Sequence, residues 1–251
     1  MSTAAGGMMV ELPDNSGEGR KADRSALAEA GLLYLVLWLR FPPAIVGASL
    51  PGPDNPSYHL ALIFSLLPCC AYVLLRMMQS EGLSGFGVEA RLKPRDIPGA
   101  VILALLLGLL ASLPAFLSRL AGAAGFPGSA NPLLDSLGRP ELPPWFFLPL
   151  VALAALATGY AEELFFRFWL PCRLSQGGLG EGAAIVLSAL MFGAAHGNQG
   201  PLAAVVATAM GGLLSLRKRG GGSWHELALG HALYDCAVLM MVLYPQGLGI
   251  A

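Results

Sequence analysis

The sequence predicts an all-α membrane protein, a polytopic bundle of about seven transmembrane helices. Of its 251 residues, 55% are hydrophobic and only 12% are charged, whereas a soluble domain carries roughly 25% charged residues. The mean hydropathy is +0.62, and the net charge of −1 leaves no basic excess to attract phosphate. These values exclude an ordinary soluble enzyme and a disordered chain, and we expect no nucleic-acid partner.

Long stretches with few or no charged residues mark the predicted spans, because a helix that crosses the bilayer needs about 20 apolar residues. They lie within residues 27–50, 57–75, 97–118, 142–170, 183–216 and 227–244. The fifth stretch is too long for one span, and the turn-forming run from Gly197 to Pro201 splits it into two. Pro42 and Pro43 kink or break the first span. Each span must be helical, since lipid offers the backbone amides no water.

The distribution of Lys and Arg predicts the orientation. With a cytoplasmic N-terminus, 12 of the 15 basic residues fall on the cytoplasmic side, as the positive-inside rule requires. Residues 1–25 are polar and Gly-rich, and we expect a flexible cytoplasmic tail there. Residues 26–251 are predicted to form one transmembrane helical domain, whose motif-bearing core spans residues 142–244.

Ionisable residues inside membrane spans are costly and are therefore candidates for function. The predicted spans contain Glu162, Glu163, Arg167, His196, His231 and Asp235. Glu163 and Arg167 are four residues apart, so they share a helix face and can pair. Glu162 projects about 100° away from Glu163, so Arg167 neutralises Glu163 and leaves Glu162 as the candidate general base.

Helix geometry places these residues at similar depths. With the α-helical rise, Glu162 lies about 16 Å from the cytoplasmic end of its span and His196 about 21 Å. His231 and Asp235 lie about 12 Å and 18 Å from theirs. Phe192 shares a face with His196, four residues later, and His231 likewise with Asp235. Three helices thus place a carboxylate and two imidazoles in one layer of the bilayer, which predicts a single site.

Structural explanations stay open for several of these residues. The ion pair of Glu163 and Arg167 could simply tie helices together. Phe192 could be a packing residue, and His196 alone could be a core histidine with satisfied hydrogen bonds. Asp235 could act by orienting His231.

Three motifs occur in order along the chain: Glu162-Glu163-x-x-x-Arg167, Phe192-x-x-x-His196 and His231-x-x-x-Asp235. Together they resemble the CPBP family, the CAAX-prenyl-protease-like and bacteriocin-processing-like intramembrane proteases, over about residues 142–244. The resemblance implies a glutamic endopeptidase in which Glu162 activates water and His196 helps to hold that water. His231 and Asp235 would stabilise the oxyanion of the tetrahedral intermediate. Glu163 and Arg167, with Phe192, would support the architecture.

The third motif of the family ends in Asn or Asp, and here it ends in Asp235. An ionised Asp cannot donate a hydrogen bond to an oxyanion. Asp235 therefore either stays protonated or orients His231, which then donates. Peptide hydrolysis needs an activated water, a base and an oxyanion stabiliser, and these residues supply all three without a Ser or Cys nucleophile.

The resemblance also implies the partners and the location. We expect the lipid bilayer as one partner and a protein or peptide substrate as the other, including C-terminal membrane-anchored or sorting segments. We expect a prokaryotic cytoplasmic membrane, with the N-terminus in the cytoplasm.

Other mechanisms fit the sequence less well. We expect no cofactor: a zincin needs H-E-x-x-H, whereas His225-Glu226 precedes His231 at a spacing of six residues. Zinc held by His196, His231 and a Glu stays an alternative. A rhomboid-like serine site fails because the G-x-S-G string at residues 82–85 lies in a charged loop, and an aspartyl dyad lacks a second intramembrane Asp beside Asp235. A non-enzymatic transporter, scaffold or immunity-type protein also stays open.

Overall fold

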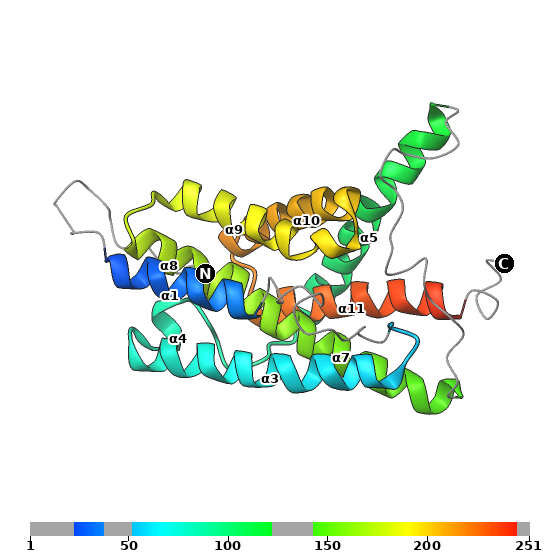
Figure 1. Cartoon of the computed structure of the whole chain (residues 1–251), viewed down its shortest axis with the longest axis horizontal. Helices are drawn as coiled ribbons and strands as arrows, with labels where there is room; N and C mark the ends of the chain where they lie inside the picture. Colours follow the sequence, from blue (N-terminus) through cyan, green and yellow to red (C-terminus); the bar gives the residue numbers. More distant parts are fainter. Residues whose placement is uncertain (1–22, 38–51, 122–142, 245–251) are drawn as a thin grey trace, which may run out of the picture.

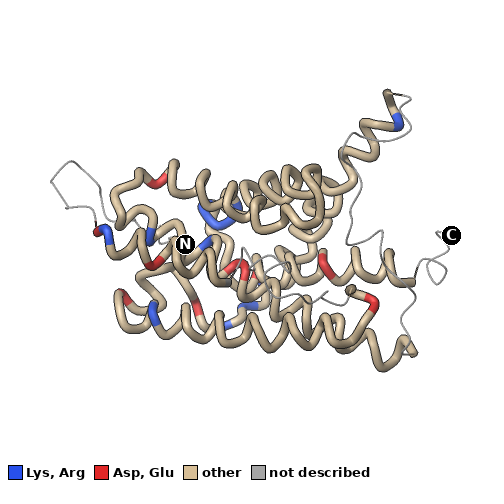
Figure 2. Tube along the Cα trace, in the orientation of Figure 1, with Lys and Arg blue, Asp and Glu red and all other residues tan. Residues whose placement is uncertain are grey.

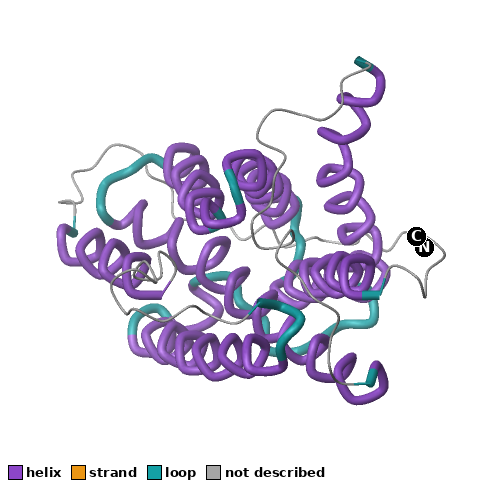
Figure 3. The backbone as a smooth tube through the Cα atoms, turned by 45° about the vertical axis from the view of Figure 1, so that its right-hand side comes forward, coloured by secondary structure: helices purple, strands orange, loops and turns teal. Residues whose placement is uncertain are grey.

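The computed structural model describes residues 23–37, 52–121 and 143–244, and this part of the chain is helical without any strand (Figure 1, Figure 3). The long helices are α1 (Arg24–Leu37), α3 (Pro56–Gln79), α5 (Asp96–Leu120), α7 (Pro144–Glu163), α9 (Glu181–Ala195), α10 (Pro201–Arg219) and α11 (Trp224–Leu243). The short elements are α4 (Gly82–Gly85), η1 (Leu164–Trp169), α8 (Leu170–Gln176) and η2 (Gly197–Gln199). The predicted all-α fold is confirmed.

Within these residues, four helical stretches are long and apolar enough to cross a membrane. They are Pro56–Gln79, Asp96–Leu120, Pro144–Gln176 and Trp224–Leu243. A fifth apolar helix, α9, is shorter. These helices make the chain an integral membrane protein. The total of seven spans stays a prediction, since residues 38–50 of the first predicted span lie outside the described part.

The predicted break in the fifth apolar stretch is confirmed. Helix α9 ends at Ala195, η2 follows, and α10 begins at Pro201. Gly200 makes the turn with φ of +105°, a backbone conformation that residues other than glycine rarely adopt.

Charged residues are unevenly distributed over the bundle. Figure 2 shows that most Lys and Arg of the described residues lie in the half of the molecule that contains α4 and α8. Arg119 lies at the opposite end, in the last turn of α5. At the charged end, Glu29 of α1 accepts a 2.5 Å hydrogen bond from Arg76 of α3 and another from Arg173 of α8. This asymmetry agrees with the predicted topology, although the orientation itself stays a prediction, as do the tail and the domain limits.

Helix α7 lies at the centre of the bundle, packed against α3 and α11 (Figure 1). The approach of α7 to α11 depends on Gly159, because a Cβ there would lie 2.5 Å from the backbone oxygen of Ala228. Helices α9 and α10 approach equally closely at Gly193, whose Cβ would lie 2.6 Å from Ala204 O. Glycine therefore lets α7 and α11, which carry the first and third predicted motifs, approach closely, and it does the same for α9, which carries the second, and α10.

The depth predicted for Glu162 assumes regular α-helix from there to Arg173, and this assumption is wrong. Residues Leu164–Trp169 form a π-helix, in which the Leu170 N–H bonds to Phe165 O. Pro171 supplies the physical reason. In an α-helix its nitrogen would be the donor to Arg167 O, but proline has no N–H and its ring clashes with that carbonyl. The wider π turn relieves the clash.

Candidate functional site

His231 of α11 lies among three carboxylates. Its Nδ1 donates a 2.8 Å hydrogen bond to Glu163 Oε1. Its Nε2 lies 3.8 Å from Glu162 Oε2 and 3.7 Å from Asp235 Oδ1. The structure thus brings the first and third predicted motifs together. Glu163 lies at one nitrogen of the His231 ring, and Glu162 and Asp235 lie at the other.

The side of the ring that faces Glu163 is sealed. Glu163 and Arg167 form an ion pair of 3.3 Å, and both side chains are 0% exposed. The Arg167 guanidinium also lies over the Phe192 ring, 4.5 Å from its centroid, an arrangement that favours a buried cation. Because Glu163 contacts both a cation and an imidazole and meets no solvent, it is suited to holding the site together.

The opposite side of the ring is less completely buried. The Asp235 side chain is 24% exposed, that of Glu162 10% and that of His231 7%. Asp235 is therefore the most exposed of the three carboxylates around this ring.

Sequence reasoning missed the group that orients His231. It offered Asp235, four residues later on the same helix, for that role. The hydrogen bond comes instead from Glu163, on another helix. Spacing within one helix cannot reveal such a contact, because it depends on how closely α7 and α11 pack.

His196 joins the cluster through Phe192. Its Nδ1 donates a 2.8 Å hydrogen bond to Phe192 O, which fixes the ring at the end of α9. The Phe192 ring centroid lies 4.6 Å from that of His196 and 6.0 Å from that of His231. The same Phe192 ring lies 4.5 Å from the Arg167 guanidinium. The second motif therefore packs beside the other two.

Among the described residues, no group of three or more His, Cys, Asp or Glu side chains is arranged to hold a metal ion. The zinc alternative stays untested. His225 lies outside the cluster: its Nδ1 is 3.0 Å from the Tyr160 hydroxyl and its ring stacks on Trp224.

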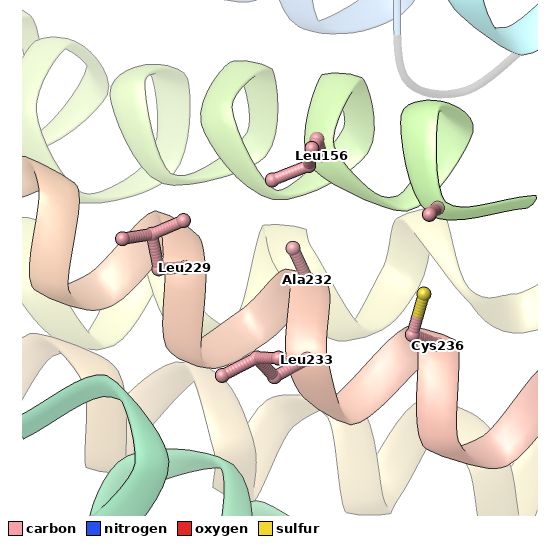
Figure 4. Close-up of a pocket in the computed structure, with 6 residues that line it drawn as sticks. Leu156, Leu229, Ala232, Leu233 and Cys236 are labelled. Carbon is pink, nitrogen blue, oxygen red and sulfur yellow. The ribbon is translucent and has the colours of Figure 1, made fainter. Parts of the chain in front are cut away.

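A pocket between α7 and α11 lies away from this chemistry. Figure 4 shows its lining, which is apolar: Ala152, Leu156, Leu229, Ala232, Leu233 and Cys236. At 100° per residue, Leu229 and Leu233 project from the side of α11 opposite His231. This pocket is not the candidate reaction site.

Comparison with known families agrees with this geometry. Residues 144–237 match the family model described as type II CAAX prenyl endopeptidase Rce1-like. This segment is similar to the CAAX protease-like family. All three motifs lie within the Rce1-like segment, residues 144–237, and the family is one of proteases. Comparisons with curated proteins and with solved structures gave no match.

Proposed function

We propose that this protein is an intramembrane endopeptidase that hydrolyses a peptide bond of a membrane-associated protein or peptide, with Glu162 as general base. One observation carries the proposal. The His231 ring is held from its buried side by Glu163 and presents Nε2 to Glu162 and Asp235. The match of residues 144–237 to a protease family supports it.

The distances fit a water-mediated reaction. At 3.8 Å, His231 Nε2 and Glu162 Oε2 are too far apart for a direct hydrogen bond and suitably placed to share a water. Glu162 takes a proton from this water as its oxygen attacks the peptide carbonyl, while His196 helps to hold the water. The proton then passes to the amine nitrogen as the C–N bond breaks.

The negative charge that develops on the carbonyl oxygen needs hydrogen-bond donors. We assign this role to Nε2 of His231, which has a proton to donate when the ring is doubly protonated because Nδ1–H is bonded to Glu163, and to Asp235 in its protonated form. The bond from Nδ1 to Glu163 already orients the imidazole, so Asp235 is not needed for that task. Asp235 lies 3.7 Å from Nε2, and its side chain is 24% exposed.

The substrate class that we propose is one that suits a site within membrane-spanning helices. Membrane-associated peptides, including C-terminal anchored or sorting segments, are the substrates we propose, in a prokaryotic cytoplasmic membrane and with the N-terminus in the cytoplasm. The contrasting possibility is a non-enzymatic scaffold or immunity-type protein with the same fold. That protein would function without cleaving anything.

Comparative proteomics tests the proposal and searches for substrates at once. C-terminal and signal-adjacent peptides are quantified in cells that carry the wild-type protein, Glu162→Gln or Glu226→Gln. Glu226 is a matched control, because it is a buried glutamate paired with Arg217 outside the candidate site. We expect cleavage products with wild type and Glu226→Gln that Glu162→Gln lacks at equal protein level. Identical peptides in all three would contradict the proposal.

A further inference from the structure

Ser188 of α9 makes a buried contact with the π-helical turn. Its side chain is 0% exposed, and its hydroxyl donates a 2.6 Å hydrogen bond to the Phe166 carbonyl of η1. Ser188, Phe192 and His196 recur at intervals of four residues and so form one stripe on α9. The face of α9 that carries the second motif is therefore bonded directly to the segment that follows Glu162 and Glu163.

The chemistry of η1 explains why this carbonyl takes a donor from another helix. In a regular α-helix, Phe166 O would accept from the N–H of Leu170, but that N–H bonds to Phe165 O instead. The next residue, Pro171, has no N–H to offer. A buried carbonyl left unsatisfied is costly, and the Ser188 hydroxyl supplies the donor.

The same contact places the reacting groups. Arg167, the partner of Glu163, lies within η1. The Phe166 ring packs edge-on against Phe192, 5.1 Å between centroids. A shift of α9 along η1 would therefore break the Ser188 bond, move Phe192 off Arg167 and displace His196 relative to His231.

We infer that Ser188 is a positioning residue, which fixes the register of α9 against the π turn and thereby holds His196 beside His231 and Glu162. The expected effect on cleavage rests on the proposed function, whereas the expected effect on the position of His196 does not. The sequence signals are a serine four residues before Phe192 and a proline, Pro171, shortly after the π turn.

Ser215 provides a matched control. It is also a buried serine, and its hydroxyl donates a 2.8 Å hydrogen bond to Gly211 O within its own helix, α10. Replacing Ser215 with Ala removes a buried hydroxyl without altering the register between α9 and η1. A general effect of losing a buried hydroxyl would appear equally in Ser188→Ala and Ser215→Ala.

Histidine NMR tests the positioning without a substrate. The sample is the purified full chain, labelled with 15N-histidine, in detergent micelles. The chain contains four histidines, His59, His196, His225 and His231. Single His→Gln variants assign the ring signal of each. Ser188→Ala is expected to shift the ring signals of His196 and His231 and to leave those of His59 and His225 in place. Ser215→Ala should shift none. Unchanged signals of His196 and His231 in Ser188→Ala would overturn the inference.

Kinetics supplies the second measurement, on a substrate from the proteomic comparison. A misplacement of about 1 Å can cost roughly 100-fold in rate, so Ser188→Ala is expected to lower kcat about 10- to 100-fold with little change in KM. Ser215→Ala should keep the wild-type kcat. If Ser188→Ala does not yield folded protein, Ser188→Cys, which keeps the volume and a weak donor, should show smaller changes in the same direction. A wild-type kcat in Ser188→Ala would refute the role of Ser188 in catalysis. Wild-type activity in Glu162→Gln would instead refute the proposed function.

Discussion

Glu163 of α7 accepts a 2.8 Å hydrogen bond from Nδ1 of His231 on α11, while the neighbouring Glu162 lies 3.8 Å from Nε2 of the same ring. Two consecutive glutamates thus approach the two nitrogens of one imidazole. Successive residues on a helix differ by about 100° in direction, and this is what lets a Glu-Glu pair reach both sides of the ring. The fully buried Glu163 orients the histidine, and Glu162, whose side chain is 10% exposed, is the general base that we propose.

The buried pair of Glu163 and Arg167 gives the first prediction. Arg167→Met leaves the Glu163 carboxylate in the interior without its guanidinium, and removing one partner of a buried pair costs about 3–5 kcal/mol of stability. We expect a lower unfolding temperature in detergent and less protein in the membrane. The double variant Glu163→Gln/Arg167→Met should recover part of the loss, because no uncompensated charge remains. Losses that simply add would count against coupling between the two residues.

Asp235 gives the second prediction. If Asp235 donates a hydrogen bond to the oxyanion, Asn can do the same, so Asp235→Asn should retain cleavage. Asp235→Ala should lose roughly 100-fold in kcat, as when one oxyanion donor is removed. The comparison is made on one substrate at equal enzyme concentration. If Asn is as inactive as Ala, Asp235 acts through its negative charge and the assignment is wrong.

The third prediction concerns the approach of α7 to α11. Gly159→Ala would place a methyl group 2.5 Å from Ala228 O, so the helices must separate and Glu163 must move away from His231. Overpacking costs about 1–3 kcal/mol, and both unfolding temperature and cleavage should fall. Gly108→Ala is the control, since a Cβ there meets nothing within 4 Å. Equal behaviour of the two variants would argue against the close approach.

Much of this arrangement could be predicted from the sequence, because helical periodicity and membrane depth act along single helices. The four-residue spacing predicted the pair of Glu163 and Arg167, and similar depths predicted that α7 and α11 would bring Glu162 and His231 together. The same reasoning could not predict the bond of Glu163 to His231, which depends on packing at Gly159.

The π turn was missed for a different reason. Regular helix geometry was assumed through Pro171, although a proline inside a helix disturbs the turn before it. The signal was therefore present in the sequence. The role of Ser188 depends on that turn. Its hydroxyl bonds to the Phe166 carbonyl of η1, and this contact between distant residues could be found only in the folded chain.

The zinc alternative gives the fourth prediction. A reaction driven by Glu162 needs no metal, so purified protein treated with 1,10-phenanthroline or EDTA should cleave at the untreated rate. The measurement is product formation before and after dialysis against the chelator. Loss of cleavage that added Zn2+ restores would instead establish a metal-dependent peptidase.

The most direct test of the central claim is cleavage by purified protein in liposomes. Wild type, Glu162→Gln and Glu226→Gln are reconstituted at equal amounts, after their unfolding temperatures show that all three are folded, and product is measured by mass spectrometry. Removing the general base should lower the rate by about 100- to 10,000-fold, whereas Glu226→Gln should keep a rate close to wild type. Cleavage by Glu162→Gln at the wild-type rate would show that Glu162 is not the base.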